Sequence, residues 1–282
     1  MSVKIVVDST TDLIPTVKER LTVVPLTIRF GEADYIDGVT ITHKEFYEKL
    51  VESDVLPTTS QATPNNFNRI FRQAQEDGDE VVVLTIASKL SGTYQSACIA
   101  AEDYPGMVYV VDSQTAAIGA GILAELALRL VDEGMSAADV ALRLVTEREK
   151  IRVIAMLDTL EYLRKGGRIS KTAAVAGGLL SIKPVVTIKE GEILVLGKAR
   201  GSKQANNLLV KEIQAAGGVD FDKPVLLGYT GLSDVLLQKY IADSAFLWEG
   251  HTDKLNTTIV GSTVGTHAGP GAVAAAFFSK EG

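Results

Sequence analysis

The chain has 282 residues, a formal net charge of −7 and a hydrophobic content of 46%. This length suggests two domains or one large one, with enough apolar residues for a sizeable core. Nucleic acid is not expected as a partner, because phosphate contacts need clustered lysine and arginine and the chain has no basic block. No apolar run reaches the roughly 18–20 residues that span a bilayer, so we expect no stable membrane insertion.

The chain has a single cysteine, Cys98, which stands in an apolar helical stretch. A disulfide framework is therefore impossible, which fits a reducing cytoplasm. We expect Cys98 to be a small buried hydrophobe. The first residues run directly into a predicted strand, so we expect no signal peptide and a cytoplasmic location.

Strand and helix patterns alternate through residues 1–150, which predicts a doubly wound α/β domain with a parallel sheet. Polar residues 8–12 are expected to cap a helix that begins near Leu13, and Thr63 to cap one that begins at Pro64. Residues 54–62 are expected to form a loop. The predicted strands are 4–7, 23–30, 80–86 and 107–111, and further helices are expected at 42–52, 94–103, 112–131 and 136–149.

The pattern changes after about residue 150, where closely spaced strands mix with helices. This predicts a second, α+β domain over residues 151–282. A short helix within 157–170 should end at a double glycine, and Glu190-Gly191 should form a turn between two strands. The predicted strands are 151–156, 183–188, 193–199, 225–229, 257–264 and 272–278, with helices at 202–215 and 232–242.

The first candidate site is the strand-to-helix loop at residues 87–97, which carries several hydroxyls and one glycine. Unpaired N–H groups of a first helical turn favour an anion, and Ser91, Thr93 and Ser96 add uncharged donors. The pattern is neither a phosphate-binding P-loop nor a Gly-x-Ser-x-Gly nucleophile elbow. An ordinary helix cap remains the alternative.

Similar hydroxyl-rich or acidic segments occur at 8–12, 58–61 and 112–113. Loops at the carboxyl ends of parallel strands meet at one edge of a sheet, where ligands bind. The loops at 8–12, 87–97 and 112–113 should therefore lie together. Their convergence predicts a site for a polar ligand.

Three further residues have two interpretations each. Arg168 and Arg200 are either surface cations beside helix ends or arginines directed at an anion or an acidic partner. His267 is either a structural or exposed histidine or a site residue, and its glycine-rich surroundings allow close backbone approach. No cysteine pair and no histidine spacing suits zinc, so we expect no metal site.

The ordered set of short motifs resembles the DegV family along nearly the whole chain, from Lys4 to Phe278. The motifs that carry the resemblance are Asp8-Ser9-Thr10-Thr11-Asp12, Val24-Pro25-Leu26, Tyr35-x-Asp37-Gly38, Thr58-x-Ser60-Gln61, Leu90 to Ala97, Asp112-Ser113, Leu160-x-Tyr162-Leu163-x-x-Gly166-Gly167-Arg168-Ile169, Lys183-Pro184 and Gly261 to Gly271.

The resemblance implies a non-catalytic carrier that buries a long-chain fatty acid between two domains and needs no cofactor. It implies that a fatty acid kinase phosphorylates the presented carboxylate to acyl phosphate for phospholipid synthesis. By the same matching, Thr59 and Ser91 would bind the carboxylate through hydroxyls, amides near Gly92 and Thr93 would assist, and His267 would lie close by. Arg168 and Arg200 would face the kinase.

Two alternatives stay open. The chain could be a hydrolase or phosphotransferase that uses Ser91 with His267, although it lacks a nucleophile elbow and a P-loop. It could also be a lipid-sensing regulatory protein. Sequence does not separate tunnel residues from core residues, and the candidates for the acyl tunnel are Ile28, Phe30, Ile118, Ile122, Leu126, Met156, Leu160 and Leu180.

Overall fold

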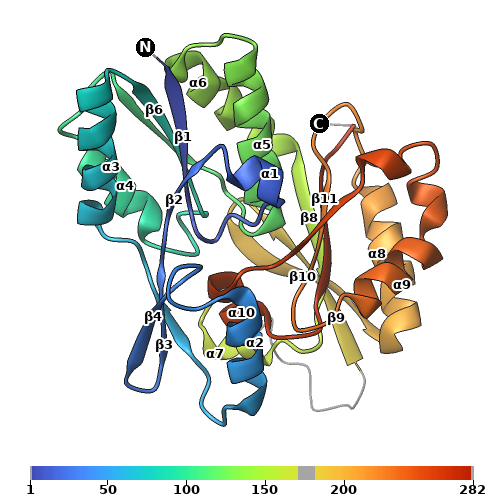
Figure 1. Ribbon diagram of the computed structural model, residues 1–282. Helices are drawn as coiled ribbons and strands as arrows, with labels where there is room; N and C mark the ends of the chain where they lie inside the picture. The colour runs from blue at the N-terminus through green and yellow to red at the C-terminus, as the bar shows by residue number, and fades with distance from the viewer. Residues whose placement is uncertain (1, 171–181, 281–282) are drawn as a thin grey trace.

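The computed structural model describes residues 2–170 and 182–280 and has the expected mixed α/β architecture (Figure 1). A four-stranded parallel sheet has the strand order β2-β1-β6-β7. Its strands are β1 (Val3–Asp8), β2 (Thr22–Val24), β6 (Glu80–Thr85) and β7 (Val108–Asp112).

Helices cover both faces of this sheet. Successive side chains of a strand point to opposite faces, so Val82 and Leu84 pack on one side, and Val81 and Val83 on the other. The first side carries α5 (Ile118–Asp132) and α6 (Ala137–Glu147), and the second carries α3 (Pro64–Asp77) and α4 (Thr93–Ala101) (Figure 1). This is the predicted doubly wound arrangement.

A six-stranded mixed sheet follows in the second half of the chain, in the order β10-β9-β8-β13-β11-β12. Among the strands that the structure describes in this sheet, β11 and β12 pair in parallel and all other neighbours pair antiparallel. The helices α8 (Gly201–Ala215) and α9 (Val235–Asp243) pack on its outer face. The strands are β8 (Ile151–Met156), β9 (Ile182–Lys189), β10 (Glu192–Arg200), β11 (Leu226–Tyr229), β12 (Asn256–Ile259) and β13 (Val273–Phe278).

Helix α5 joins the two sheets, because it packs against β1 of the first and against β11 and β13 of the second. It is apolar almost all round, as expected for a helix buried on several sides. Gly121 stands where α5 crosses the loop after β1, and a Cβ there would lie 2.0 Å from the carbonyl oxygen of Asp12. A bare glycine backbone therefore permits this close crossing.

A small antiparallel sheet, β4-β3-β5, lies below the first two. Its strands are β3 (Thr27–Phe30), β4 (Ala33–Ile36) and β5 (Thr58–Ser60). Against it pack α2 (His43–Glu52) and α10 (Ser262–Ala268), and α10 also contacts α7 (Glu161–Lys165). The first half of the chain thus contributes two sheets, and α10 of the second half packs beside the smaller one. The remaining short helices are α1 (Pro15–Lys18) and the 3₁₀ turns η1 (Arg148–Lys150), η2 (Ala245–Leu247) and η3 (Thr252–Lys254).

Several boundaries differ from the prediction. Residues 23–30 form two strands in different sheets, β2 and β3, because Pro25 cannot donate a ladder hydrogen bond and the N–H of Leu26 donates to the Ser9 hydroxyl. The expected loop at 54–62 contains strand β5. The helix after residues 8–12 begins only at Pro15 and has no side-chain cap.

Two later elements also differ. The helix predicted to open at Asp112-Ser113 begins at Ile118, because Gln114 and Ala117 have positive φ angles of 54° and 53° that interrupt any helix. The strand predicted over 257–264 ends at Ile259, and α10 replaces its second half. No helix in residues 2–170 or 182–280 is long and apolar enough to cross a membrane.

Candidate functional site

A mostly apolar cavity of about 400 Å³ lies between the loops that end the parallel sheet and the face of the six-stranded sheet. Strands β8, β9, β10 and β13 supply one wall. That wall contains Val153, Ala155, Val186, Ile188, Ile193 and Ala274. The volume is within the roughly 300–1,000 Å³ that is usual for small-molecule sites.

Leucine, isoleucine, valine and alanine residues line this cavity, and most of them differ from those of the sequence prediction. Its lining includes Ala116 and Ala117 before α5, Ala155 on β8 and Ala268 at the end of α10. Of the tunnel candidates, Ile118 lines the cavity, and Leu180 lies outside the described residues. The other candidates lie outside the lining; they are Ile28, Phe30, Ile122, Leu126, Met156 and Leu160. Those residues outside the lining are buried in the close-packed interior instead.

One end of the cavity is polar and brings together four of the predicted binding residues. Thr59 comes from β5, Ser91 and Gly92 from the loop before α4, and His267 from α10. The Thr59 Oγ1 and His267 Nε2 atoms are 2.9 Å apart, although the residues are 208 positions apart in the chain. The hydroxyl loops therefore meet a histidine from the opposite half of the protein.

Thr93 occupies a different place from its neighbours. Its side chain is fully buried and lies outside the cavity lining. The Oγ1 atom is 3.0 Å from the Ser91 Oγ, and the Thr93 N–H donates to that same Oγ at 3.3 Å. Thr93 thus contacts Ser91 from the side that faces the protein interior. The hydroxyl and the amide of Thr93 are both used by Ser91 and do not reach the cavity.

The segment after β5 packs against the first turn of α4 through a side-chain hydrogen bond. Gln61, which also lines the cavity, donates from Nε2 to the Ser96 hydroxyl at 3.0 Å. A Cβ at Gly92 would lie 2.1 Å from the Gln61 Oε1, so glycine at this position makes room for the amide. The prediction did not include Gln61 as a site residue, although its place beside the hydroxyls of 58–60 offered the signal.

His267 is held in a neutral form. Burial, and secondarily the positive charge of Arg168, lower the pKa of His267 to about 4. Its Nδ1 is buried and has no hydrogen-bond partner among the described residues. A Cβ at Gly166 would lie 2.1 Å from this Nδ1, so Gly166 makes room for the imidazole in addition to ending α7.

The two arginines occupy different places. Arg168 is half-buried in the cavity lining, where its Nε donates to the Leu90 carbonyl at 3.2 Å and its Nη1 to the Gly166 carbonyl at 2.6 Å. It therefore connects the loop that carries Ser91 with the turn beside His267. Arg200 is exposed at the end of β10, outside the cavity lining.

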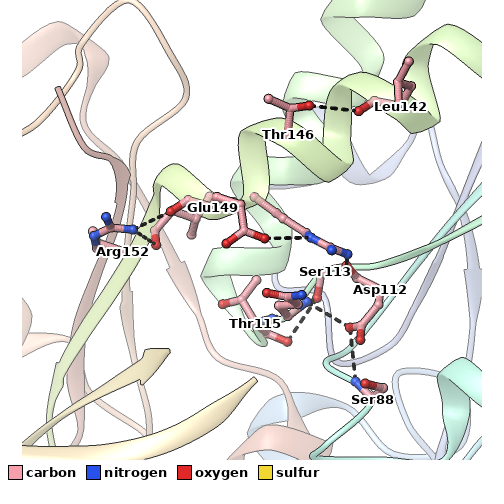
Figure 2. Close-up of polar contacts among 11 residues, drawn as sticks. Ser88, Asp112, Ser113, Thr115, Leu142, Thr146, Glu149 and Arg152 are labelled. Carbon is pink, nitrogen blue, oxygen red and sulfur yellow. Dashed lines mark hydrogen bonds and ion pairs between the residues drawn. The ribbon is translucent and has the colours of Figure 1, made fainter. Parts of the chain in front are cut away.

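The Asp112-Ser113 segment lies beside the loop at 87–97, as predicted, but neither residue lines the cavity. The Asp112 carboxylate accepts hydrogen bonds from the N–H groups of Ser88 at 3.1 Å and Gln114 at 2.9 Å (Figure 2). The Ser113 hydroxyl donates to the Thr115 carbonyl. These hydrogen bonds fix the conformation of the loop between β7 and α5, which places Ala116 and Ala117 in the cavity wall.

The predicted pair of Ser91 with His267 is not in hydrogen-bond contact among the described residues. Within the described part of the chain, the Ser91 hydroxyl contacts Thr93, and the His267 Nε2 contacts Thr59. A serine nucleophile needs a base within hydrogen-bonding reach. Residues 2–170 and 182–280 also contain no group of three or more histidine, cysteine, aspartate or glutamate residues that could hold a metal ion.

Comparison with known proteins gives the family. Residues 2–280 match the DegV family, whose description calls it uncharacterised. A DegV domain-containing protein of Caldanaerobacter subterraneus subsp. tengcongensis is 36% identical over 261 residues, which cover 92% of this chain and 91% of the relative. The chain therefore belongs to the DegV family.

Solved structures agree with this assignment. A fatty acid-binding DegV family protein of Thermus thermophilus is 35% identical, with a TM-score of 0.88 and coverage of 99% of this chain and 100% of that one. The Streptococcus pneumoniae fatty acid kinase (Fak) B3 protein, loaded with linoleic acid, is 24% identical. It covers 99% of both chains with a TM-score of 0.86 and shows the shared fold.

We predict that His267 titrates near pH 4 in the folded protein, because burial disfavours the imidazolium. The folded-state pKa is below the ordinary value of 6.5, so the unfolded state binds more protons between these values. Stability should therefore fall from about pH 6.5 to about pH 4, and His267→Gln should remove this contribution. NMR titration and urea unfolding measure both effects; a His267 pKa of 6.5 or above would contradict the prediction.

Proposed function

We propose that this chain binds a long-chain fatty acid with its tail in the apolar cavity and its carboxylate beside Thr59, Ser91 and His267. The supporting observation is that one apolar cavity ends at Thr59, Ser91 and His267, all uncharged at neutral pH. We further propose that the bound carboxylate is presented to a fatty acid kinase for acyl phosphate formation.

Burial of the tail supplies most of the affinity in this arrangement. Each CH₂ group removed from water contributes about 0.8 kcal/mol. A neutral donor to the charged head contributes about 1.5–3 kcal/mol. The Ser91 and Thr59 hydroxyls can donate to a carboxylate without forming an ion pair, while the neutral His267 contacts Thr59. The head therefore remains reactive toward a phosphoryl donor.

Arg168 supplies positive potential without enclosing the head group. Two of its guanidinium nitrogens donate to the carbonyls of Leu90 and Gly166. A bidentate arginine–carboxylate pair would occupy both oxygens of the fatty acid. An arginine already bonded to backbone carbonyls instead offsets part of the cost of burying the negative charge.

The relatives favour a binding protein over a catalyst. The Thermus thermophilus protein, 35% identical along its full length, is described as binding fatty acid. The absence of a Ser91–His267 contact in the described residues agrees with a carrier and weakens the hydrolase alternative. The kinase step rests on the family resemblance and on the description of the Streptococcus pneumoniae protein, which shares the fold.

The first experiment is organic extraction of the purified, denatured protein, followed by mass spectrometry. We expect a fatty acid in stoichiometric amount, because an apolar cavity of about 400 Å³ retains its ligand during purification. The extract also gives the chain preference. An empty extract, together with no binding of added fatty acids, would remove the proposal.

We predict that Ser91→Ala weakens fatty acid binding roughly 10- to 100-fold, because it removes one donor to a charged group. The free energy of unfolding should fall by only about 1 kcal/mol, because the Thr93 N–H and hydroxyl lose the Ser91 Oγ. Ser88→Ala is the matched control, because Ser88 is exposed in the same loop and outside the lining. Equal affinity of the two variants would place the carboxylate elsewhere.

The places of the two arginines separate binding from presentation. We predict that Arg200→Glu lowers phosphorylation of the bound acid by a kinase and leaves fatty acid affinity unchanged, because Arg200 is exposed away from the cavity. Arg168→Glu should lower both, because Arg168 lines the cavity. Binding and kinase assays measure the two quantities, with Arg72→Glu on the exposed side of α3 as control. Normal phosphorylation of Arg200→Glu would contradict a role in presentation.

A further inference from the structure

A buried carboxylate holds the helix that carries His267. Asp37 lies in the segment between β4 and α2 and is 3% exposed. Its Oδ2 accepts from the Thr263 hydroxyl at 2.6 Å and from the Thr263 N–H at 3.2 Å. Both donors belong to the first turn of α10, so Asp37 fixes the start of this helix.

Thr263 and His267 are four positions apart, which places them on the same face of α10. That face, with Val264 and Ala268, lines the cavity. The hydrogen bonds from Thr263 to Asp37 therefore fix the rotation of α10 about its axis. This rotation sets the direction of the His267 imidazole. Gly265 seats the helix closely on α2, since a Cβ there would lie 2.5 Å from the Tyr47 hydroxyl.

The same carboxylate also contacts the loop that follows β1. The Ser9 hydroxyl donates to the Asp37 Oδ2 at 3.0 Å and itself accepts from the N–H of Leu26, a lining residue. The neighbouring Asp8 accepts from the N–H of Ile86 at 2.8 Å, in the segment that leads to Ser91. Contacts through Asp37 and residues 8–9 thus connect α10 with Leu26 and with the segment that leads to Ser91.

Burial of a carboxylate costs free energy unless hydrogen bonds compensate. Here three donors converge on the Asp37 Oδ2, while its Oδ1 is buried and has no partner among the described residues. A single acceptor oxygen at this position would therefore satisfy all three donors. The amide oxygen of asparagine has the same reach.

We propose that Asp37 is a positioning residue for the fatty acid head group, because it orients α10 so that His267 faces Thr59 and the carboxylate. This inference rests on the proposed function. It assigns to a residue outside the cavity lining a specific effect on recognition of the head group, with no effect on the tail.

The test compares a fatty acid with the alcohol of the same chain length, because the two share the tail and differ at the head. We expect Asp37→Ala to reduce the preference for the acid about tenfold, equivalent to about 1.4 kcal/mol, and to change the affinity for the alcohol little. Asp37→Asn should restore most of the preference. Ser244→Ala, which removes a buried hydrogen bond to Trp248 near α9, is the matched control for lost stability.

The His267 imidazole gives a second, spectroscopic readout. Burial and Arg168 hold its pKa at about 4, so a rise toward 6.5 in Asp37→Ala reports movement of the ring out of its site. Where Asp37→Ala does not fold, Thr263→Val removes the hydroxyl donor alone and should raise this pKa in the same direction. An unchanged preference and an unchanged His267 pKa in the folded variants would overturn the inference.

The outcomes also distinguish this inference from the function on which it rests. If the wild-type protein prefers the acid to the alcohol and Asp37→Ala keeps the same preference, the role of Asp37 alone is overturned. Wild-type protein that shows no preference for the acid overturns both. An equal loss of preference in Ser244→Ala and Asp37→Ala would reduce the effect to general stability and would also overturn the positioning role.

Discussion

The hydrogen bond between Thr59 and a neutral His267 is the contact on which the site depends. It joins β5 of the first half of the chain to α10 of the second across 208 positions of sequence. The imidazole stays neutral because it is buried beside Arg168, and it fits because Gly166 has no side chain. A charged or displaced histidine would alter the polar end of the cavity without touching its walls.

Aliphatic residues of several elements and a few alanines line the cavity at the junction of the sheets. Helix α5 is buried between them and fills the space with large side chains such as Ile122 and Leu126. At its N-terminal end the sequence changes to Ala116 and Ala117, and the facing strands supply Ala155 and Ala274. The same packing that stabilises the core therefore leaves an apolar space at one end.

The sequence predicted those features that depend on local pattern. The βαβ unit around residues 80–112 was predicted from its strands and helix, and the Ser91 loop from its hydroxyls before a helix. Asp112 also is a polar residue at the end of a parallel strand. Its carboxylate, however, accepts from the N–H of Gln114 in its own loop and from the N–H of Ser88 in the neighbouring loop. Which polar loop faces a ligand depends on contacts between distant segments, and periodicity does not report those.

Helix α10 shows the same limit. Its sequence is rich in small and β-branched residues, which suit a strand as well as a helix, and Asp37 and Gly265 supply the tertiary contacts that favour the helix.

Two groups of cavity residues have separate roles. In the proposed function, the Ser91 and Thr59 hydroxyls beside His267 recognise the head group, and the apolar walls set the space for the tail. A larger residue at a wall position fills part of the cavity and leaves the donors in place, so the selection of an acyl chain can change independently of how its carboxylate is held.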